Sequence, residues 1–475
     1  MADWRGKNSS RLVGCLVLAL GMSACASPAV TRPEAGIPVP ANWTETDQAP
    51  LSPDIARYWR LLDDPLLTQF VETALVGNLD LAQSTARLGQ ARAQLRGARA
   101  GYWPQVSASG RVQQDVLDNA ADRPLISLGA DARWELDLFG RIGGAVAASD
   151  ADLAAAGYSL ADLQRLIAGQ VALATIGARA TALQLAVARD TLNYQDENLQ
   201  IARWRAQAGL VSSLDVEQAR NQRAQTAASI PLLESNLAAT ANALSTLIGE
   251  PPGRVLGLLQ APAAIPAPPD VAGFEAPAAV LRRRPDVRGA EASLVASMAR
   301  IQVARAQLLP AIQLGGTLGT SSLGLGSLFD LVTGGVFGAL SQLIFDGGRT
   351  GAQVDSARAV ADGALAAWRL SILGALEDVE TAAVDLDKSR QRVAIYGEAF
   401  DAANNSAILA RSQYQAGLTD FRNLLTSESQ LLSARNAQIA AEADRASAFV
   451  RLTQALGGGW SPADYPLPLS DGTDP

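Results

Sequence analysis

The stretch Trp134-Glu135-Leu136-Asp137-Leu138-Phe139-Gly140-Arg141-Ile142 is the most informative in the chain, because a strand pattern ends here and a helical pattern begins. Apolar residues alternate at Trp134, Leu136 and Leu138, which predicts a β-strand with one apolar face. From Arg141 the pattern predicts a single helix over 141–205. About 65 residues at about 1.5 Å each give a helix of about 97 Å. Helices of globular proteins average about 11–12 residues, so this length predicts a coiled-coil or helical-barrel body.

The landmarks around this stretch occur twice in the chain. Phe139-Gly140-Arg141 recurs within Phe345-Asp346-Gly347-Gly348-Arg349, with the arginines 208 positions apart. Ala208-Gly209-Leu210 recurs as Ala416-Gly417-Leu418, and Leu247-Ile248-Gly249 as Ala455-Leu456-Gly457, both at the same offset. Tyr102-Trp103-Pro104 recurs as Leu308-Leu309-Pro310 at an offset of 206. Landmarks in one order at a nearly constant spacing indicate an internal duplication.

Each copy has the same predicted order of elements. A helix (66–101, then 286–308) ends at a proline, which cannot continue it. Two strands follow (about 104–138, then 310–346), then a very long helix (141–205, then 349–413) and a return helix (213–248, then 421–456). The strands have roughly the length that a tilted membrane strand needs. The predicted boundaries are 1–24 signal peptide, 25–65 N-terminal tether or equatorial segment, 66–249 first repeat, 250–285 proline-rich crossover, 286–457 second repeat and 458–475 C-terminal tail.

The N-terminus has the pattern of an exported lipoprotein. Basic residues precede a short apolar run, Leu12 to Gly21, which is too short for a mature membrane helix. Met22-Ser23-Ala24-Cys25 then places two small residues before a cysteine, which predicts cleavage before Cys25 and a diacylglycerol on its thiol. The alternative is an ordinary signal peptide cut near Ala24 or Ala26. No later stretch shows a run of about 18 apolar residues, so a membrane crossing is expected to be a closed β-barrel.

Composition argues against several classes of function. The chain contains no histidine, which removes the commonest general base and the commonest metal ligand. Its formal charge of −8 lacks the basic excess that nucleic-acid binding normally requires. The chain also shows no clustering of charged ligands at metal spacing. We therefore expect no enzyme, no metal and no cofactor other than the lipid on Cys25.

The two Ala-Gly-Leu sites are predicted to be the tips of helical hairpins, because glycine suits a left-handed helix cap. Polar residues gather around them. One interpretation is that these residues only cap the helices and keep the tips soluble. The other is that they join neighbouring hairpins and close one end of a pore. The tip candidates are Asp215, Tyr414, Asp420 and Arg422, together with the turn residues Gly209, Leu210, Gly417 and Leu418.

The order and duplication of these motifs, with Leu281-Arg282-Arg283-Arg284-Pro285-Asp286-Val287 between the copies, resemble the TolC-like outer-membrane efflux proteins, specifically the lipoprotein NodT/OprM type. The resemblance covers about residues 40–460. It implies a mainly helical homotrimer in which each subunit gives four strands to a 12-stranded barrel, joined to a long helical barrel with a mixed equatorial domain. It also implies tips that dock a periplasmic adaptor linked to an inner-membrane pump. Family members often carry acids a few positions after the second tip glycine, where this chain has Asn423 and Thr426.

The resemblance predicts a passive exit duct in the outer membrane, serving a tripartite pump of the resistance–nodulation–division type that exports small toxic molecules. Two alternatives stay open at this point. The same fold serves type I protein secretion, and a coiled-coil lipoprotein could lack a pore. The alternating strand at Trp134 argues against the second alternative, and the substrate is not encoded in any motif.

Overall fold

The computed structural model describes residues 35–44, 55–114, 124–269 and 275–461. These residues form two compact units. The first, here called the strand unit, contains Arg87–Ala156 and Gly289–Arg369. The second, here called the helical unit, contains Ile37–Ala86, Gly157–Arg288 and the described residues 370–461. Cys25, the predicted lipid-bearing residue, lies outside the described residues.

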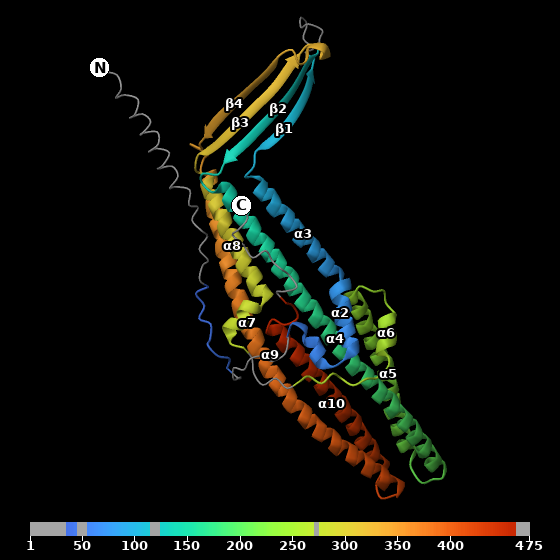
Figure 1. Cartoon of the computed structure of the whole chain (residues 1–475). Coiled ribbons are helices and arrows are strands. Elements are labelled where there is room, and N and C mark those ends of the chain that lie inside the picture. The colour runs from blue at the N-terminus through green and yellow to red at the C-terminus, as the bar shows by residue number, and fades with distance from the viewer. Residues whose placement is uncertain (1–34, 45–54, 115–123, 270–274, 462–475) are drawn as a thin grey trace, which may run out of the picture. The chain divides into compact units, whose positions relative to one another are not determined.

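The strand unit contains a four-stranded antiparallel sheet in the order β1-β2-β3-β4 (Figure 1). Its strands are β1 (Gln105–Gln113), β2 (Leu125–Leu136), β3 (Ala311–Ser322) and β4 (Val332–Ser341). β1–β2 come from the first copy and β3–β4 from the second, and β2 pairs with β3 at Trp134↔Leu314 and Leu128↔Thr320. The two halves of the duplication therefore meet in one continuous sheet, whose outer strands β1 and β4 each pair on one side only among the described residues.

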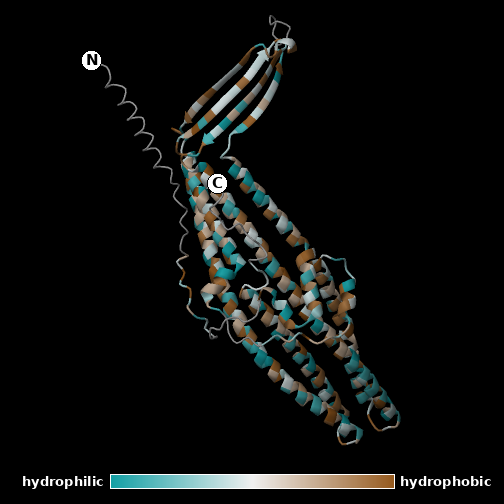
Figure 2. Cartoon of the chain, viewed as in Figure 1, coloured by the Kyte–Doolittle hydropathy of each residue, from teal (hydrophilic) through white to brown (hydrophobic). Residues whose placement is uncertain are grey.

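The two faces of this sheet differ in chemistry because side chains alternate along each strand. The register places Val106 opposite Ala132 and Ala132 opposite Gly316, on the face that also carries Trp134, Leu314, Leu318, Val336 and Leu340. The other face carries Ser107, Asp131, Arg133, Glu135, Gln313 and Thr317. Figure 2 shows the resulting alternation of hydropathy along the strands. The apolar face is exposed in the single chain, with Val336 92% and Val106 75% accessible.

Two very long helices dominate the chain. α4 (Arg141–Gln207) and α9 (Arg349–Gln415) each contain 67 residues, which corresponds to about 100 Å at about 1.5 Å per residue. Each is followed by a return helix, α5 (Ser213–Ile248) or α10 (Phe421–Ala455). α5 continues through Pro231 as one helix. The remaining elements are η1 (Ile55–Leu62), α2 (Pro65–Gly77), α3 (Leu79–Ala100), α6 (Arg254–Leu259), α7 (Pro277–Arg283), α8 (Pro285–Ala306) and η2 (Leu325–Ser327).

Two expectations from the sequence are wrong. The helix predicted over 66–101 is two helices, α2 and α3, because the chain turns at Asn78, whose φ and ψ are −68° and 129°. The second wrong expectation is that no stretch after the signal peptide has the composition of a membrane-spanning helix. α4 and α9 each contain an 18-residue window that is apolar enough to cross a membrane by length and composition, with 56% and 17% of the window buried. Alanine is the reason: it scores as apolar while also being the residue that packs helices closely together.

The core of the helical unit lies where η1, α2, α5 and α10 pack together. Its largest fully buried side chains include Tyr58, Phe70, Leu244 and Phe449. The glycines after α10 allow close backbone approach, because a Cβ on Gly458 would lie 2.6 Å from the Ile55 carbonyl oxygen. Gly459 then donates its backbone N–H to that oxygen at 3.0 Å. The residues that follow the second copy are thereby joined to η1, which precedes the first copy.

Candidate functional site: hairpin tips and a buried arginine network

The two predicted tip turns have the same backbone geometry. Gly209 and Gly417 have φ values of 71° and 72°, in the left-handed region where glycine is favoured. In the first turn Leu210 N donates to Arg205 O at 2.8 Å, and in the second Leu418 N donates to Gln413 O at 2.8 Å. These bonds satisfy carbonyls that the helix ends leave free. Leu210 and Leu418 are 73% and 79% exposed, so each tip presents an apolar side chain to its surroundings.

The two tip acids cap the return helices. Asp215 accepts from the Ser212 backbone N–H at 3.0 Å while Ser212 Oγ accepts from Asp215 N at 3.4 Å, a reciprocal capping box at the start of α5. Asp420 accepts from Asn423 N at 2.9 Å at the start of α10. Each carboxylate therefore stabilises its own hairpin and also lies at the positive end of a helix dipole.

Tyr414 lies in a small apolar core shared by the ends of α4, α5, α9 and α10. Its ring contacts Phe421 with centroids 5.2 Å apart, and the guanidinium of Arg205 lies 4.4 Å from its centroid. Leu199, Ala202, Ala219, Ala410 and Leu424 complete this core. The Tyr414 hydroxyl is buried and has no hydrogen-bond partner among the described residues. An unpaired buried hydroxyl is costly, and a partner outside this chain would remove that cost.

The other tip candidates remain on the surface. Arg422, Asn423 and Thr426 are exposed. The Asn423 side chain donates to Thr419 Oγ1 at 3.0 Å. The two positions where family members often carry acids therefore hold uncharged, solvent-accessible residues here.

A polar contact below the tips was not predicted from the sequence. Glu428 on α10 is only 7% exposed, and Asn198 Nδ2 on α4 donates to both its oxygens at 3.0 and 2.8 Å. Arg411 on α9 donates to the same carboxylate at 3.1 Å, and its guanidinium lies 5.1 Å from the Tyr194 ring centroid. The contact borders a groove of about 270 Å³ between α4, α9 and α10. Residues 230 positions apart carry no shared sequence signal, so only the fold brings them together.

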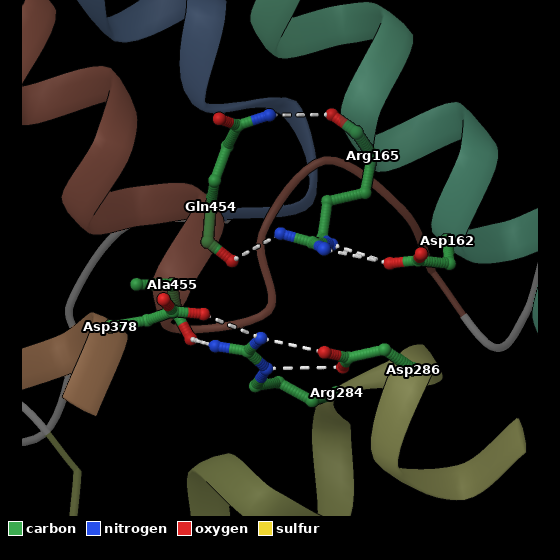
Figure 3. A network of polar contacts seen from close by, with 7 residues as sticks. All are labelled: Asp162, Arg165, Arg284, Asp286, Asp378, Gln454 and Ala455. Carbon is green, nitrogen blue, oxygen red and sulfur yellow. Dashed lines mark hydrogen bonds and ion pairs between the residues drawn. The ribbon is translucent and has the colours of Figure 1, made fainter. Parts of the chain in front are cut away.

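A second polar network lies at the C-terminal end of α10 (Figure 3). Arg284 Nη1 donates to Ala455 O at 3.2 Å, and Arg165 Nη1 donates to Gln454 O at 3.3 Å. Two arginines thus cap consecutive carbonyls at the negative end of a helix dipole. Gln454 Nε2 returns a bond to Arg165 O at 2.8 Å.

Carboxylates compensate the charges of both arginines. Asp286 accepts from Arg284 Nε and Nη2 at 3.0 and 2.6 Å, and Asp378 accepts from Nη2 at 2.8 Å. Burial works against the charge of Arg284, but the bonds to Asp286 and Asp378 outweigh it and raise its pKa above the ordinary value. Burial would also raise the pKa of Asp286, but Arg284 and then Arg165 lower it below its ordinary range. The arginine before Pro285, which the sequence singled out only as part of a motif, is thus the centre of a buried joint.

The described residues contain no group of three or more cysteine, aspartate or glutamate side chains placed to hold a metal ion. The tips and the arginine network therefore offer helix caps, aromatic contacts and ion pairs. This arrangement can hold helices together and recognise other helices.

A duplicated pair of long helical hairpins joined to a two-faced sheet defines a class of envelope transport protein. The model of the outer membrane efflux protein family matches residues 70–250 and 276–458. The chain belongs to this family. It is therefore an efflux transport protein of the outer membrane.

Individual relatives match over nearly their whole length. The chain is 31% identical over 473 residues to the pyoverdine export outer membrane protein OpmQ of Pseudomonas putida, covering 95% of this chain and 98% of that protein. It is 28% identical to nodulation protein T of Rhizobium leguminosarum bv. trifolii, covering 95% and 96%. Among solved structures, the outer-membrane channel OprN superposes with a TM-score of 0.81 at 33% identity, covering 91% of this chain and all of that one. CusC gives a TM-score of 0.76 at 26% identity, with the same coverage of both chains.

Proposed function

We propose that this protein is the passive exit duct of a tripartite efflux pump, built as a homotrimer with a 12-stranded barrel in the outer membrane. The observation that carries the proposal is the four-stranded sheet, with one exposed apolar face, one polar face and two edges that pair with no further strand in the part of the chain that the structure describes. A sheet with these faces fits a barrel wall that has lipid outside and water inside. Unpaired backbone edges are not tolerated in hydrocarbon, so β1 and β4 need strands from other copies.

The strand count favours three copies. Two copies of four strands would close a barrel of about eight strands, whose interior is filled by side chains. Three copies give about twelve strands and leave room for a channel. The strands contain 9, 12, 12 and 10 residues, close to the roughly 9–11 that a tilted membrane strand requires.

The long helices supply a periplasmic tunnel in this proposal. Large apolar residues of α9 are exposed in the single chain, including Leu370 (71%), Ile395 (63%) and Leu409 (61%). Packing against the helices of neighbouring copies would bury them. The apolar window of α9, only 17% buried in one chain, has the same explanation and needs no membrane-spanning helix.

The transport energy would come from a partner pump. The names of relatives support this assignment, since they include a toluene efflux pump outer membrane protein and a pyoverdine export outer membrane protein. We therefore assign small molecules as the cargo, a periplasmic adaptor as the partner of the tips at Leu210 and Leu418, and an inner-membrane pump of the resistance–nodulation–division type beyond it. The duct has no catalytic role and no cofactor apart from a lipid on Cys25.

Two measurements test the duct. Native mass spectrometry of the purified full-length protein should give a trimer, and planar bilayers should show small ion currents. The N-terminal lipid is tested by Cys25→Ser, which should abolish acylation while leaving the trimer intact, since the barrel anchors independently. A monomeric helical product without conductance would exclude the duct.

The tip gate is the part of the proposal that depends on single residues. We expect Asp215→Ala combined with Tyr414→Phe to raise single-channel conductance, because both side chains sit where the hairpins end. Glu234→Ala with Tyr396→Phe is the matched control, since it removes the same chemistry from α5 and α9 away from the tips. Equal conductance in both double variants would leave Asp215 as a helix cap only.

A further inference from the structure

A pair of arginines marks the places where helices enter the sheet. Arg99 on α3 and Arg305 on α8 are both exposed and lie 206 positions apart, the offset of the Pro104 and Pro310 landmarks. Each comes six residues before the first residue of a strand, β1 or β3. Arg96 lies one turn earlier on α3 and is also exposed. These three residues are here called the arginine collar.

The acids near the strand ends are already engaged. Asp137 accepts from the backbone N–H groups of Ile142 and Gly143 at 2.9 and 2.6 Å, so it caps α4. Asp346 accepts from Thr350 N at 2.8 Å and caps α9. Glu135 forms a two-point ion pair with Arg141 at 2.6 and 2.5 Å.

The collar arginines therefore keep their charge available. Arg99 approaches Asp150 at 3.9 Å, but both side chains are about half exposed, and such surface pairs contribute little. Arg96 and Arg305 carry no ion pair within the described part of the chain. The duplication thus preserves a positive charge at this level in both copies without giving it a buried partner.

Exposed apolar and aromatic side chains lie at the junctions between the helices and the strands. Trp103 is 73% exposed, and Ile344 and Phe345 are each 88% exposed. Tyr102, Leu308 and Leu309 are also exposed at the same junctions. Aromatic side chains with a polar edge are enriched where a membrane protein meets the lipid headgroups. α3 and α8 end at Ala100 and Ala306, one residue after Arg99 and Arg305, so the collar lies at the helix ends next to these exposed side chains.

We infer that the arginine collar binds the phosphate groups of anionic phospholipids in the leaflet that faces the helices. The inference rests on the outer-membrane location and extends it to a lipid partner. Trp103 and the neighbouring apolar residues would contact the upper acyl chains while Arg96, Arg99 and Arg305 reach the headgroups. Long arginine side chains suit this position because the stem lies on apolar surface while the head stays in the polar layer.

The test compares lipid binding by full-length wild type with Arg99→Gln/Arg305→Gln. Binding of dioleoyl phosphatidylglycerol and of dioleoyl phosphatidylcholine is measured by native mass spectrometry in detergent. Wild type should prefer phosphatidylglycerol, and the double variant should lose about fivefold in its affinity per arginine removed. Arg60→Gln/Arg220→Gln is the matched control, because it removes two exposed arginines of the helical unit. The control should keep the wild-type preference.

Equal binding of the two lipids by wild type, or an unchanged preference in Arg99→Gln/Arg305→Gln, would overturn the collar. Soluble glycerol phosphate binding as tightly as the lipid would do so as well, since the site would then be for free phosphate. Conductance of the double variant separates this result from the duct proposal. If Arg99→Gln/Arg305→Gln conducts ions but has no lipid preference, both the collar and the duct are supported. If wild type shows no conductance, only the duct is contradicted.

Discussion

The two copies of the repeat make the same joint with different chemistry. In the first copy Asn78, between α2 and α3, donates its side-chain Nδ2 to Leu247 O at 2.8 Å near the end of α5. In the second, Arg284, between α7 and α8, donates to Ala455 O at 3.2 Å at the end of α10. The two acceptors lie 208 positions apart, so they are equivalent by the duplication. A neutral amide and a charged guanidinium occupy corresponding places.

The difference follows from whether each side chain can accept hydrogen bonds. The Asn78 Oδ1 accepts from Asp80 N and Leu81 N at 2.9 and 3.1 Å, so one residue caps both α3 and the end of α5. Arginine has five donors and no acceptor. Arg284 therefore cannot cap α8, which begins at Pro285, and its buried charge requires Asp286 and Asp378. A duplicated joint can therefore retain its geometry while one copy becomes dependent on charge.

The largest expected effect comes from removing the guanidinium of the second joint. Arg284→Met leaves two carboxylates and the Ala455 carbonyl without their partner, and breaking a buried pair costs about 3–5 kcal/mol. We expect the melting temperature, followed by tryptophan fluorescence in detergent, to fall by about 5–10 °C. Arg282→Met, at an exposed position of the same motif, should change it by less than about 2 °C. Equal melting temperatures for the two variants would contradict the charged joint.

Replacing the glycines that follow the return helices with alanine should reduce stability by unequal amounts. Gly249 and Gly457 both have positive φ, 75° and 80°, and alanine there costs about 1–2 kcal/mol. A Cβ on Gly249 would also lie 2.2 Å from the Gly77 carbonyl oxygen, whereas one on Gly457 would meet side-chain carbons of Arg283 and Arg284 at 3.4 Å. Gly249→Ala should therefore destabilise by about 2–4 kcal/mol and Gly457→Ala by about 1–2 kcal/mol. Thermal melts of both variants in one detergent check the order, and a reversed order would contradict the tighter first joint.

Removing the amide of the first joint should have a moderate effect. Asn78→Ala deletes a helix cap, worth about 1 kcal/mol, and leaves the Leu247 carbonyl unsatisfied. We expect a loss of about 2 kcal/mol, below that of Arg284→Met, because no charge is left unpaired. Asn78→Asp is the informative companion, since it retains the cap acceptor while losing the donor to Leu247. A loss in Asn78→Ala equal to that in Arg284→Met would remove the distinction between the two joints.

The smallest expected effect is that of acid, which should weaken the second joint before the first. The pKa of Asp286 is lowered in the folded state, so its stabilising contribution is fully present above its unfolded value of about 3.9 and is lost as pH falls through the folded value. Near the first joint, the pKa of Glu250 is lowered by its bond to Arg254, but that exposed pair contributes little. Hydrogen exchange at the ends of α5 and α10, followed from about pH 5 down to about pH 2, should show extra opening only in α10. Asp286→Asn should remove this pH dependence.

The sequence predicted the duplication, the long helices and the tip turns because these depend on local rules. Alternating side chains, glycine caps and proline stops act within a few residues, so Trp134, Gly209 and Gly417 carried readable signals. The break at Asn78 was missed because an asparagine within an otherwise helical pattern does not by itself end a helix. Its turn is held by the bond to Leu247, 169 positions away.

The candidate site divides in the same way. Local patterns were enough to predict which residues lie at the tips and that the strands have two different faces. Helix packing, in contrast, buries Tyr414 beneath Arg205, places Glu428 in contact with two other helices, and brings Arg284 to the end of α10. These roles depend on pairings across more than a hundred positions, and such pairings are set by helix packing rather than by local propensity. The sequence does not distinguish a charged side chain that lies in solvent from one that is paired with a buried carboxylate. Burial is a property of the folded chain alone.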